Sequence, residues 1–335
     1  MFAPALRLHR ELSVRIADDG DRDEIDNLLA AMMPGADIPG RRRWLYDTNP
    51  AGRALTWVAT AGTGEVVGCT SFFPFKLWLE GTTVRAALGG DAYVLPEFRR
   101  VGLGRMLHDA SRKAMRAHDI ACMFGAPGAM NVTPLVSGGS RIVGEVARWA
   151  RPLRGVPGLV ARTFDRVLRP GPAQLDPMLP DDGRVDLVWR AAREEQRLCT
   201  VRNAAFYSWR FLDAPGGQQT PFVIVADGLP IGACALEPIE VGRVMRIVDM
   251  IAIPGAWHAC LSAIAHHTRA TSRARILDVK LMAGDARRRR MWLSAFRERE
   301  TKPFLCMRAE GGDLRLLDGD RWFYGGADSD LAGLA

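Results

Sequence analysis

The sequence predicts an α/β fold in which a mixed β-sheet is flanked by helices and the whole plan occurs twice along the chain. Three observations predict it. Strand-like and helix-like patterns alternate over residues 13–140, an arginine- and glycine-rich turn joins a strand to an amphipathic helix, and several features of the first half recur in the same order in the second. With 335 residues the chain is long enough for two domains.

The elements of the first half follow from hydrophobic periodicity. Residues 13–17 alternate like a strand, and residues 21–24, Asp-Arg-Asp-Glu, begin a helix with acidic residues in its first turn. Further elements are expected as strands at 56–60, 66–77, 85–95 and 120–124, a helix with one apolar stripe at 101–118, and a helix from Asn131. The predicted order is therefore β-α-α-β-β-β-α-β-α.

The turn before the helix at 101–118 has the composition of an anion site. Arg99 and Arg100 precede Gly102 and Gly104. Glycines let the backbone turn its N–H groups toward a ligand, and the first turn of a helix carries unpaired donors and partial positive charge. A phosphate group would fit there, with charge-assisted bonds from the arginines. The alternative is a helix start that contains glycine and holds no ligand.

In this β-α context, the spacing Arg99-x-x-Gly102-x-Gly104 resembles the acyl-CoA loop of the GNAT superfamily of N-acyltransferases. The resemblance implies two tandem GNAT-like domains, each a central mixed sheet flanked by helices, and an acetyl-CoA or longer acyl-CoA co-substrate. The residues expected to contact the coenzyme are Val94 and Leu95 along pantetheine, Arg99, Arg100, Val101, Gly102, Leu103, Gly104 and Arg105 around the pyrophosphate, and Asn131 in the next helix.

Acyl transfer to an amine also needs a proton acceptor for the amine and a proton donor for the leaving thiolate. The resemblance implies Asp91 as the general base, with Asp249 as its weaker counterpart in the second half. Alternatively, Asp91 only caps the preceding glycine turn. The stretch from residue 131 to 140 lacks the tyrosine that often serves as the acid in this family, which leaves Tyr93, water or a residue of the second half.

The second half repeats the first in register. Trp44 and Pro50 recur as Trp209 and Pro215 with the same spacing. The segment 91–96, Asp-x-x-x-x-Pro, recurs at 249–254, but no Arg-x-x-Gly-x-Gly follows it. The second half is therefore expected to lack a working coenzyme loop and to shape the acceptor site or support the fold.

These patterns divide the chain into an N-terminal domain at 11–150, a basic linker at 151–183 and a C-terminal domain at 184–330. The linker contains a short amphipathic helix at 157–169 with several arginines. Such a helix either packs on one domain or lies on an anionic membrane surface.

Composition limits the kinds of ligand and the cellular location that the protein is expected to have. The net charge of +7 suits an anionic ligand, an anionic membrane or nucleic acid, but no nucleic-acid-binding motif or long basic arm is present, which disfavours nucleic acid. No apolar run is long enough to span a membrane, and the N-terminus does not resemble a secretory signal. The six scattered cysteines predict reduced core thiols, and no metal is expected. These features indicate a cytoplasmic protein, with peripheral attachment to the inner membrane face as an alternative.

The leading hypothesis is an acyl-CoA-dependent N-acyltransferase in which a small-molecule or lipid amine attacks the thioester directly. The first alternative, from a different class, is a degenerate GNAT module that binds CoA or acyl-CoA without catalysis. The second is a long-chain N-acyltransferase that acts on a lipid amine at the membrane surface.

Overall fold

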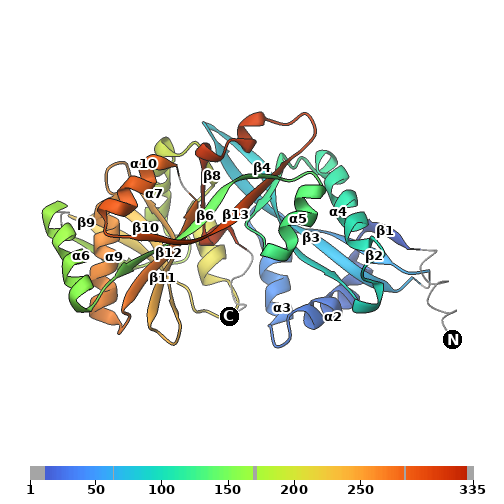
Figure 1. The fold of residues 1–335 in the computed structure, drawn as a ribbon, viewed down its shortest axis with the longest axis horizontal. Helices are drawn as coiled ribbons and strands as arrows, with labels where there is room; N and C mark the ends of the chain where they lie inside the picture. The colour runs from blue at the N-terminus through green and yellow to red at the C-terminus, as the bar shows by residue number, and fades with distance from the viewer. Residues whose placement is uncertain (1–11, 63, 169–171, 283, 330–335) are drawn as a thin grey trace.

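The computed structural model describes residues 12–62, 64–168, 172–282 and 284–329, and its strands form one mixed sheet that runs through both halves of the molecule (Figure 1). Hydrogen-bonded neighbours follow the order β1-β2-β3-β4-β5-β13-β6-β12-β11-β10-β9-β7. The first-half strands are β1 (Ser13–Ile16), β2 (Leu55–Thr60), β3 (Val66–Leu79), β4 (Thr82–Val94) and β5 (Cys122–Gly125). The second-half strands are β7 (Ala173–Pro177), β9 (Thr220–Ala226), β10 (Leu229–Ile239), β11 (Val244–Ala252) and β12 (Ile276–Met282). The predicted α/β class and mixed sheet are confirmed.

The helices occur in the same order in both halves. The first half contains α2 (Arg22–Met32), α3 (Ile38–Arg41), a π-helix (Arg42–Asp47), α4 (Leu103–Ala114) and α5 (Ala129–Ser137). The second contains α7 (Gly183–Ala192), α8 (Ala204–Tyr207), a π-helix (Ser208–Leu212), α9 (Trp257–Thr271) and α10 (Asp285–Leu293). The helix expected at 101–118 is thus α4 followed by a single 3₁₀ turn, and the helix expected from Asn131 begins at Ala129.

The two halves exchange a strand at the centre of the sheet. β6 (Arg141–Pro152) follows α5 in the chain, yet it pairs with β12 of the second half. Conversely, β13 (Arg297–Arg308) follows α10 and pairs with β5 of the first half. β6 and β13 are also antiparallel neighbours of each other. The boundaries predicted at 150 and 184 therefore divide the sequence but not the sheet.

A reciprocal tryptophan contact joins the halves at the repeated motif. The indole Nε1 of Trp44 donates to the carbonyl of Trp209, and the indole of Trp209 donates to the carbonyl of Trp44, both at 2.8 Å. Their rings stack with centroids 5.4 Å apart, and both are buried. Each lies in the π-helix of its half. The spacing repeat in the sequence thus marks equivalent positions that meet each other across the junction.

Two short strands complete the core. β14 (Trp322–Gly325) pairs with β12 and with β8 (Leu198–Thr200), and β8 pairs with β3. The helix between the halves, α6 (Gly155–Leu168), corresponds to the one expected at 157–169. Among the described residues no helix is both long enough and apolar enough to cross a bilayer.

Candidate functional site

The first half has an opening between two parallel strands. β4 and β5 pair only at Ala87 with Met123 and at Leu88 with Phe124. Beyond this point β5 ends at Gly125, whereas β4 continues to Val94. Residues 89–94 of β4 keep β3 on one side but have no β5 partner on the other. Backbone donors and acceptors along this edge are therefore available to an extended ligand that lies parallel to the strand.

A β-bulge in this segment turns Asp91 into the protein. The β3–β4 register shifts between Cys69 and Ser71, and Asp91 has a φ of 49°. Its side chain is buried. Asp91 accepts hydrogen bonds from Arg41 Nη2 at 2.6 Å and Nε at 3.2 Å, and from the hydroxyl of Tyr46 at 2.7 Å.

This geometry does not support Asp91 as the general base. A base must reach the amine that it deprotonates and must have an oxygen free to accept the proton. The Asp91 carboxylate is held by a buried guanidinium instead, so it fixes the bulge and orients the strand. Burial, with a further contribution from Asp91, raises the pKa of the Tyr46 hydroxyl, which therefore stays protonated as a donor. Tyr93, the other expected acid or base on this strand, lies half-buried.

The N-terminus of α4 adjoins the open edge and presents free backbone donors. Gly102 caps the helix with a φ of 88°, and its carbonyl accepts from the N–H groups of Arg105 and Met106. Within the described part of the chain, the N–H groups of Leu103 and Gly104 have no backbone acceptor. Gly104 is exposed, and an added Cβ there would have no atom within 4 Å. This helix end has the room and the polarity for a phosphate group.

The neighbouring arginines differ in their roles. Arg99 donates from Nε to the carbonyl of Val94 at 2.9 Å, and its guanidinium lies 5.3 Å from the ring centroid of Tyr93. Arg99 therefore stabilises the end of β4. Arg100 adopts a left-handed conformation, with a φ of 65°, and is exposed, as is Arg105. Of the two arginines before the glycines, Arg100 is the one whose side chain remains available to an anion.

Three further expected residues lie around the opening. Leu95 donates its N–H to the carbonyl of Val67 at 3.0 Å, so that group is not free to polarise a thioester. Val94, the last residue of β4, is half-buried, and Val101 is exposed in the loop. Asn131 is exposed in the first turn of α5.

Comparison with known proteins agrees with this geometry. Residues 13–133 match a family model described as "Acetyltransferase (GNAT) domain". Both this match and the fold support the GNAT superfamily. No curated protein matches the chain by sequence.

Several solved structures share the GNAT-like fold over both halves. A GCN5-related N-acetyltransferase from Anabaena variabilis ATCC 29413 has a TM-score of 0.65 at 15% identity, over 88% of this chain and 72% of that one. A probable N-acyltransferase from Enterococcus faecalis V583 has a TM-score of 0.67 at 13% identity, over 90% and 73%. A GCN5-related N-acetyltransferase from Kribbella flavida has a TM-score of 0.64 at 14% identity, over 90% and 73%.

The second half contains a counterpart of the Asp91 cluster. The β10–β11 register shifts beside Asp249, whose buried carboxylate accepts from Arg202 Nε at 2.9 Å and from the Tyr207 hydroxyl at 3.0 Å. Burial raises the pKa of the Asp249 carboxyl, and the Arg202 charge opposes this shift. Arg202 also donates to Asp328 at 2.6 Å. Asp249 is thus tied into the core, and its expected role as a base or acceptor contact does not fit this geometry.

Sequence reasoning missed both arginine–tyrosine partner sets. Arg41 and Tyr46 flank Trp44, whereas Arg202 and Tyr207 both precede Trp209. The arginine and the tyrosine are five residues apart in both clusters, but the pair is offset by four residues relative to the repeated tryptophan, so a search for repeats in register with the tryptophan does not detect it. The signal that could have found them is the presence of an arginine and a tyrosine near each repeated tryptophan.

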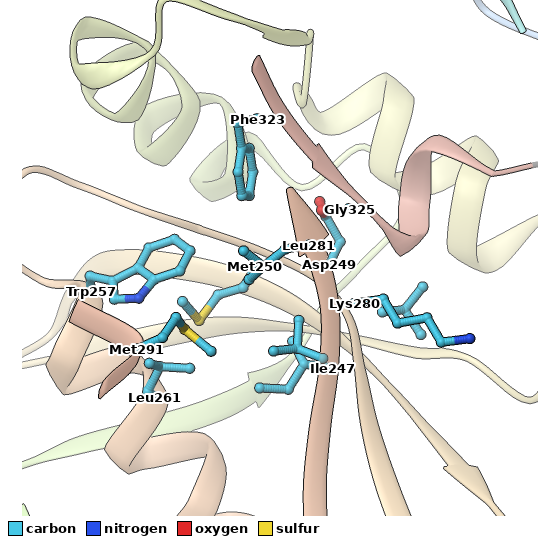
Figure 2. A pocket seen from close by; sticks show the side chains of 12 residues that line it. Ile247, Asp249, Met250, Trp257, Leu261, Lys280, Leu281, Met291, Phe323 and Gly325 are labelled. Atoms are coloured by element: carbon cyan, nitrogen blue, oxygen red, sulfur yellow. The ribbon is translucent and has the colours of Figure 1, made fainter. Parts of the chain in front are cut away.

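In the second half, β14 closes the space between β11 and β12 that corresponds to the opening between β4 and β5. β11 and β12 pair from Val244–Ile276 to Ile247–Val279 and then diverge. Beyond that point Gly325 of β14 pairs with Leu281 of β12. Figure 2 shows Phe323, Gly325 and Trp257 among the residues that line the narrow cavity that remains, and the rings of Phe323 and Trp257 meet edge to face with centroids 6.2 Å apart.

The first turn of α9 is also unlike that of α4. α9 begins with the buried Trp257, and the guanidinium of Arg287 lies 5.2 Å from the ring centroid of Trp257 and 4.1 Å from that of Phe323. An aromatic–cation stack therefore occupies the space beside the helix N-terminus. The first half thus has an unpaired strand edge next to free helix amides, whereas in the second half other side chains and β14 occupy the corresponding space.

The cysteines and potential metal ligands contribute no further site. Burial raises the pKa of the thiols of Cys69, Cys199 and Cys260 to about 12, and all six cysteines are buried. Thiols of this kind have little thiolate and are poor nucleophiles. Among the described residues there is no cluster of three His, Cys, Asp or Glu side chains that could hold a metal ion.

Proposed function

We propose that the first half binds an acyl-CoA thioester and transfers its acyl group to an acceptor amine. The observation that carries the proposal is the junction of two unpaired backbone surfaces, the β4 edge at 89–94 and the α4 amides of Leu103 and Gly104. CoA has a matching pair of features, a pantetheine arm with amide groups and a pyrophosphate. The match of residues 13–133 to a GNAT domain model supports the same assignment.

Each part of the site has a defined task in this proposal. The α4 amides and Arg100 hold the pyrophosphate, and the β4 edge pairs with the pantetheine amides and aligns the thioester. The amine nitrogen attacks the thioester carbonyl carbon, the carbon–sulfur bond breaks, and the thiolate takes up a proton. Because both Asp91 oxygens accept hydrogen bonds from Arg41, the amine proton passes to water in this proposal. Tyr93, which carries the only hydroxyl among residues 89–94 of the strand, protonates the thiolate.

The second half serves in this proposal as a degenerate GNAT copy. Its strand order and its Arg–Asp–Tyr cluster support the repeat. A second coenzyme would not bind, because β14 occupies the space between β11 and β12 where the second site would be. The donor is acetyl-CoA or a longer acyl-CoA, and the acceptor is a small-molecule or lipid amine.

A second candidate function is CoA binding without catalysis. The specific observation in its favour is that Asp91 and Asp249, the two carboxylates expected to act in proton transfer, are both engaged in buried ion pairs. Release of free thiol from acyl-CoA in the presence of a panel of amines separates the two functions. Binding of CoA with no thiol release from any amine would favour the binding module.

The test of coenzyme binding uses Gly104→Val and a matched control, Gly183→Val. Both glycines lie in the first turn of a helix, and an added Cβ meets no atom within 4 Å at either position. Neither change is therefore expected to unfold the protein. CoA, acetyl-CoA and palmitoyl-CoA should raise the thermal midpoint of the wild type and of Gly183→Val but not of Gly104→Val. Equal stabilisation of the Gly104→Val protein would overturn the site.

A further inference from the structure

In its first two turns, the helix α6 exposes three apolar side chains to solvent. Val156 is 75% exposed, Leu159 60% and Val160 56%, whereas Ala161 is only 2% exposed. α6 packs through Ala161 and through Gly158, where an added Cβ would lie 2.6 Å from the backbone of Leu153. At Leu159 and Val160, therefore, the apolar stripe faces solvent and not a domain.

Loops of the second half extend this apolar surface. Val241, in the turn between β10 and β11, is fully exposed, and Ile276 at the start of β12 is 37% exposed. Hydrogen bonds tie these segments to the start of α6. The N–H of Leu153 donates to the carbonyl of Arg275, and the N–H of Arg275 donates to the carbonyl of Arg243, both at 2.8 Å. The exposed apolar residues thus come from adjoining segments at one end of the molecule.

An arginine lies within three residues of each of these apolar side chains in the sequence. Five of them are exposed and have no carboxylate within ion-pair distance in the part of the chain that is described: Arg154, Arg162, Arg243, Arg273 and Arg275. The guanidinium of Arg154 donates to the carbonyls of Arg269, Ser272 and Ala274 and forms no ion pair with a described carboxylate. Burial and the nearby positive charges of Arg151, Arg162 and Arg154 lower the pKa of Arg269. Arg154 and Arg162 thus contribute to a local excess of positive charge, which an external anionic surface would offset.

We propose that this α6 face, formed by Val156, Leu159, Val160, Val241, Ile276 and the five exposed arginines, binds the surface of an anionic lipid bilayer. Arginines at the headgroups and aliphatic side chains between them are the two features that such a surface recognises. Nucleic acid would use the arginines but would leave the exposed valine and leucine side chains without a role. A phospholipid surface accounts for both.

The position of the face fits peripheral binding. α6 and α9 lie at the opposite end of the molecule from α4 (Figure 1). A bilayer at the α6 face would therefore leave the α4 N-terminus in water, where it remains open to a soluble coenzyme. This inference does not depend on acyl transfer, because it uses none of the residues of the first-half site.

The test is co-sedimentation of the full-length protein with vesicles. One set contains phosphatidylcholine alone, and the other contains phosphatidylcholine mixed with phosphatidylglycerol. Arg273→Gln/Arg275→Gln should weaken binding to the anionic vesicles roughly 25-fold, because each arginine near such a surface contributes about fivefold. Leu159→Ser/Val160→Ser should weaken it as well. The matched control, Lys113→Gln/Arg116→Gln, removes the same charge from exposed positions in the first half and should bind as the wild type does.

Thermal midpoints of all variants establish that each is folded. Binding to the mixed vesicles but not to phosphatidylcholine, lost in the α6-face variants and kept in the control, supports the proposal. Absence of binding to mixed vesicles, or equal weakening in the control, would overturn it. So would tight binding to duplex DNA that is unaffected by Leu159→Ser/Val160→Ser, since the face would then be a nucleic-acid surface.

Discussion

Removal of the Asp91 carboxylate should damage stability much more than chemistry. Asp91 and Arg41 form a buried pair with side chains 2% and 3% exposed, joined at 2.6 Å. Removing one member of a buried pair costs about 3–5 kcal/mol, because the remaining charge was desolvated in exchange for that contact. Asp91→Ala also takes away the acceptor of the Tyr46 hydroxyl. We therefore expect the free energy of unfolding of Asp91→Ala to fall by about 3–5 kcal/mol.

The second half offers the matched control for this prediction. Asp249 has an equivalent arginine and tyrosine but faces the filled opening. If both aspartates act through structure, Asp249→Ala should also lose stability, but by less than Asp91→Ala, because Arg202 keeps its ion pair with Asp328. The measurement is urea unfolding followed by tryptophan fluorescence, which the nine tryptophans make sensitive.

Turnover measured per folded molecule separates the structural role from a catalytic one. Asp91→Asn is the appropriate variant, because asparagine tolerates the left-handed backbone of the bulge and keeps one acceptor oxygen for Tyr46. We expect thiol release per folded molecule to stay close to that of the wild type. Loss of a general base costs about 100-fold or more. A loss of that size in Asp91→Asn, with normal stability and with Asp249→Asn unaffected, would refute this reasoning and restore Asp91 as the base.

Three further predictions concern the junction, the histidines and the thiols. Trp44→Phe and Trp209→Phe should each destabilise the protein by about 1–2 kcal/mol by leaving a buried carbonyl unpaired, and a double-mutant cycle in urea should show coupling, since the rings also stack. Burial lowers the pKa of His258 in the folded protein below 6.5, its value in the unfolded chain. The folded state is therefore not destabilised by this histidine above pH 6.5 and loses stability as the pH falls below it. The thermal midpoint of His258→Gln should decrease less than that of the wild type between about pH 7 and pH 5. All six cysteines should resist a thiol-specific disulfide reagent in the native protein and react once urea is added; rapid native reaction of any of them would contradict the burial described here.

The local features of the first half were predictable because they depend on neighbouring residues. The turn with Gly102 and Gly104 needs only a left-handed position and an amphipathic run after it, and both are visible in the sequence. The repeated tryptophans were also visible, since their spacing to the following proline is the same in both halves. Their reciprocal hydrogen bonds required the three-dimensional arrangement, because 165 residues separate them.

The features that were harder to predict depend on which of several similar strands or side chains, far apart in the sequence, come into contact. Residues 141–152 form a strand that could pair with either half, and periodicity does not distinguish β5 from β12 as its neighbour. Similarly, the pattern of α6 identifies an apolar stripe but not the side on which the protein lies. The partner of Asp91 lies 50 residues away, so the sequence showed the carboxylate without the guanidinium that neutralises it.

The strand exchange gives the second half a structural role at the opening of the first half, where we propose that the coenzyme binds. β13 comes from the second half, and it pairs with the strand that forms one side of the opening, β5. Lys302 of β13 donates to the carbonyl of Ala126, directly beyond the end of β5. Without β13, β5 would become an edge strand of four residues. The second half thus builds one wall of the open site while its own opening is filled by β14. β14 is itself anchored in the core, because Asp328 accepts hydrogen bonds from both Arg202 and the N–H of Gly325 in β14. An asymmetric pair with one site is the arrangement that this connectivity favours.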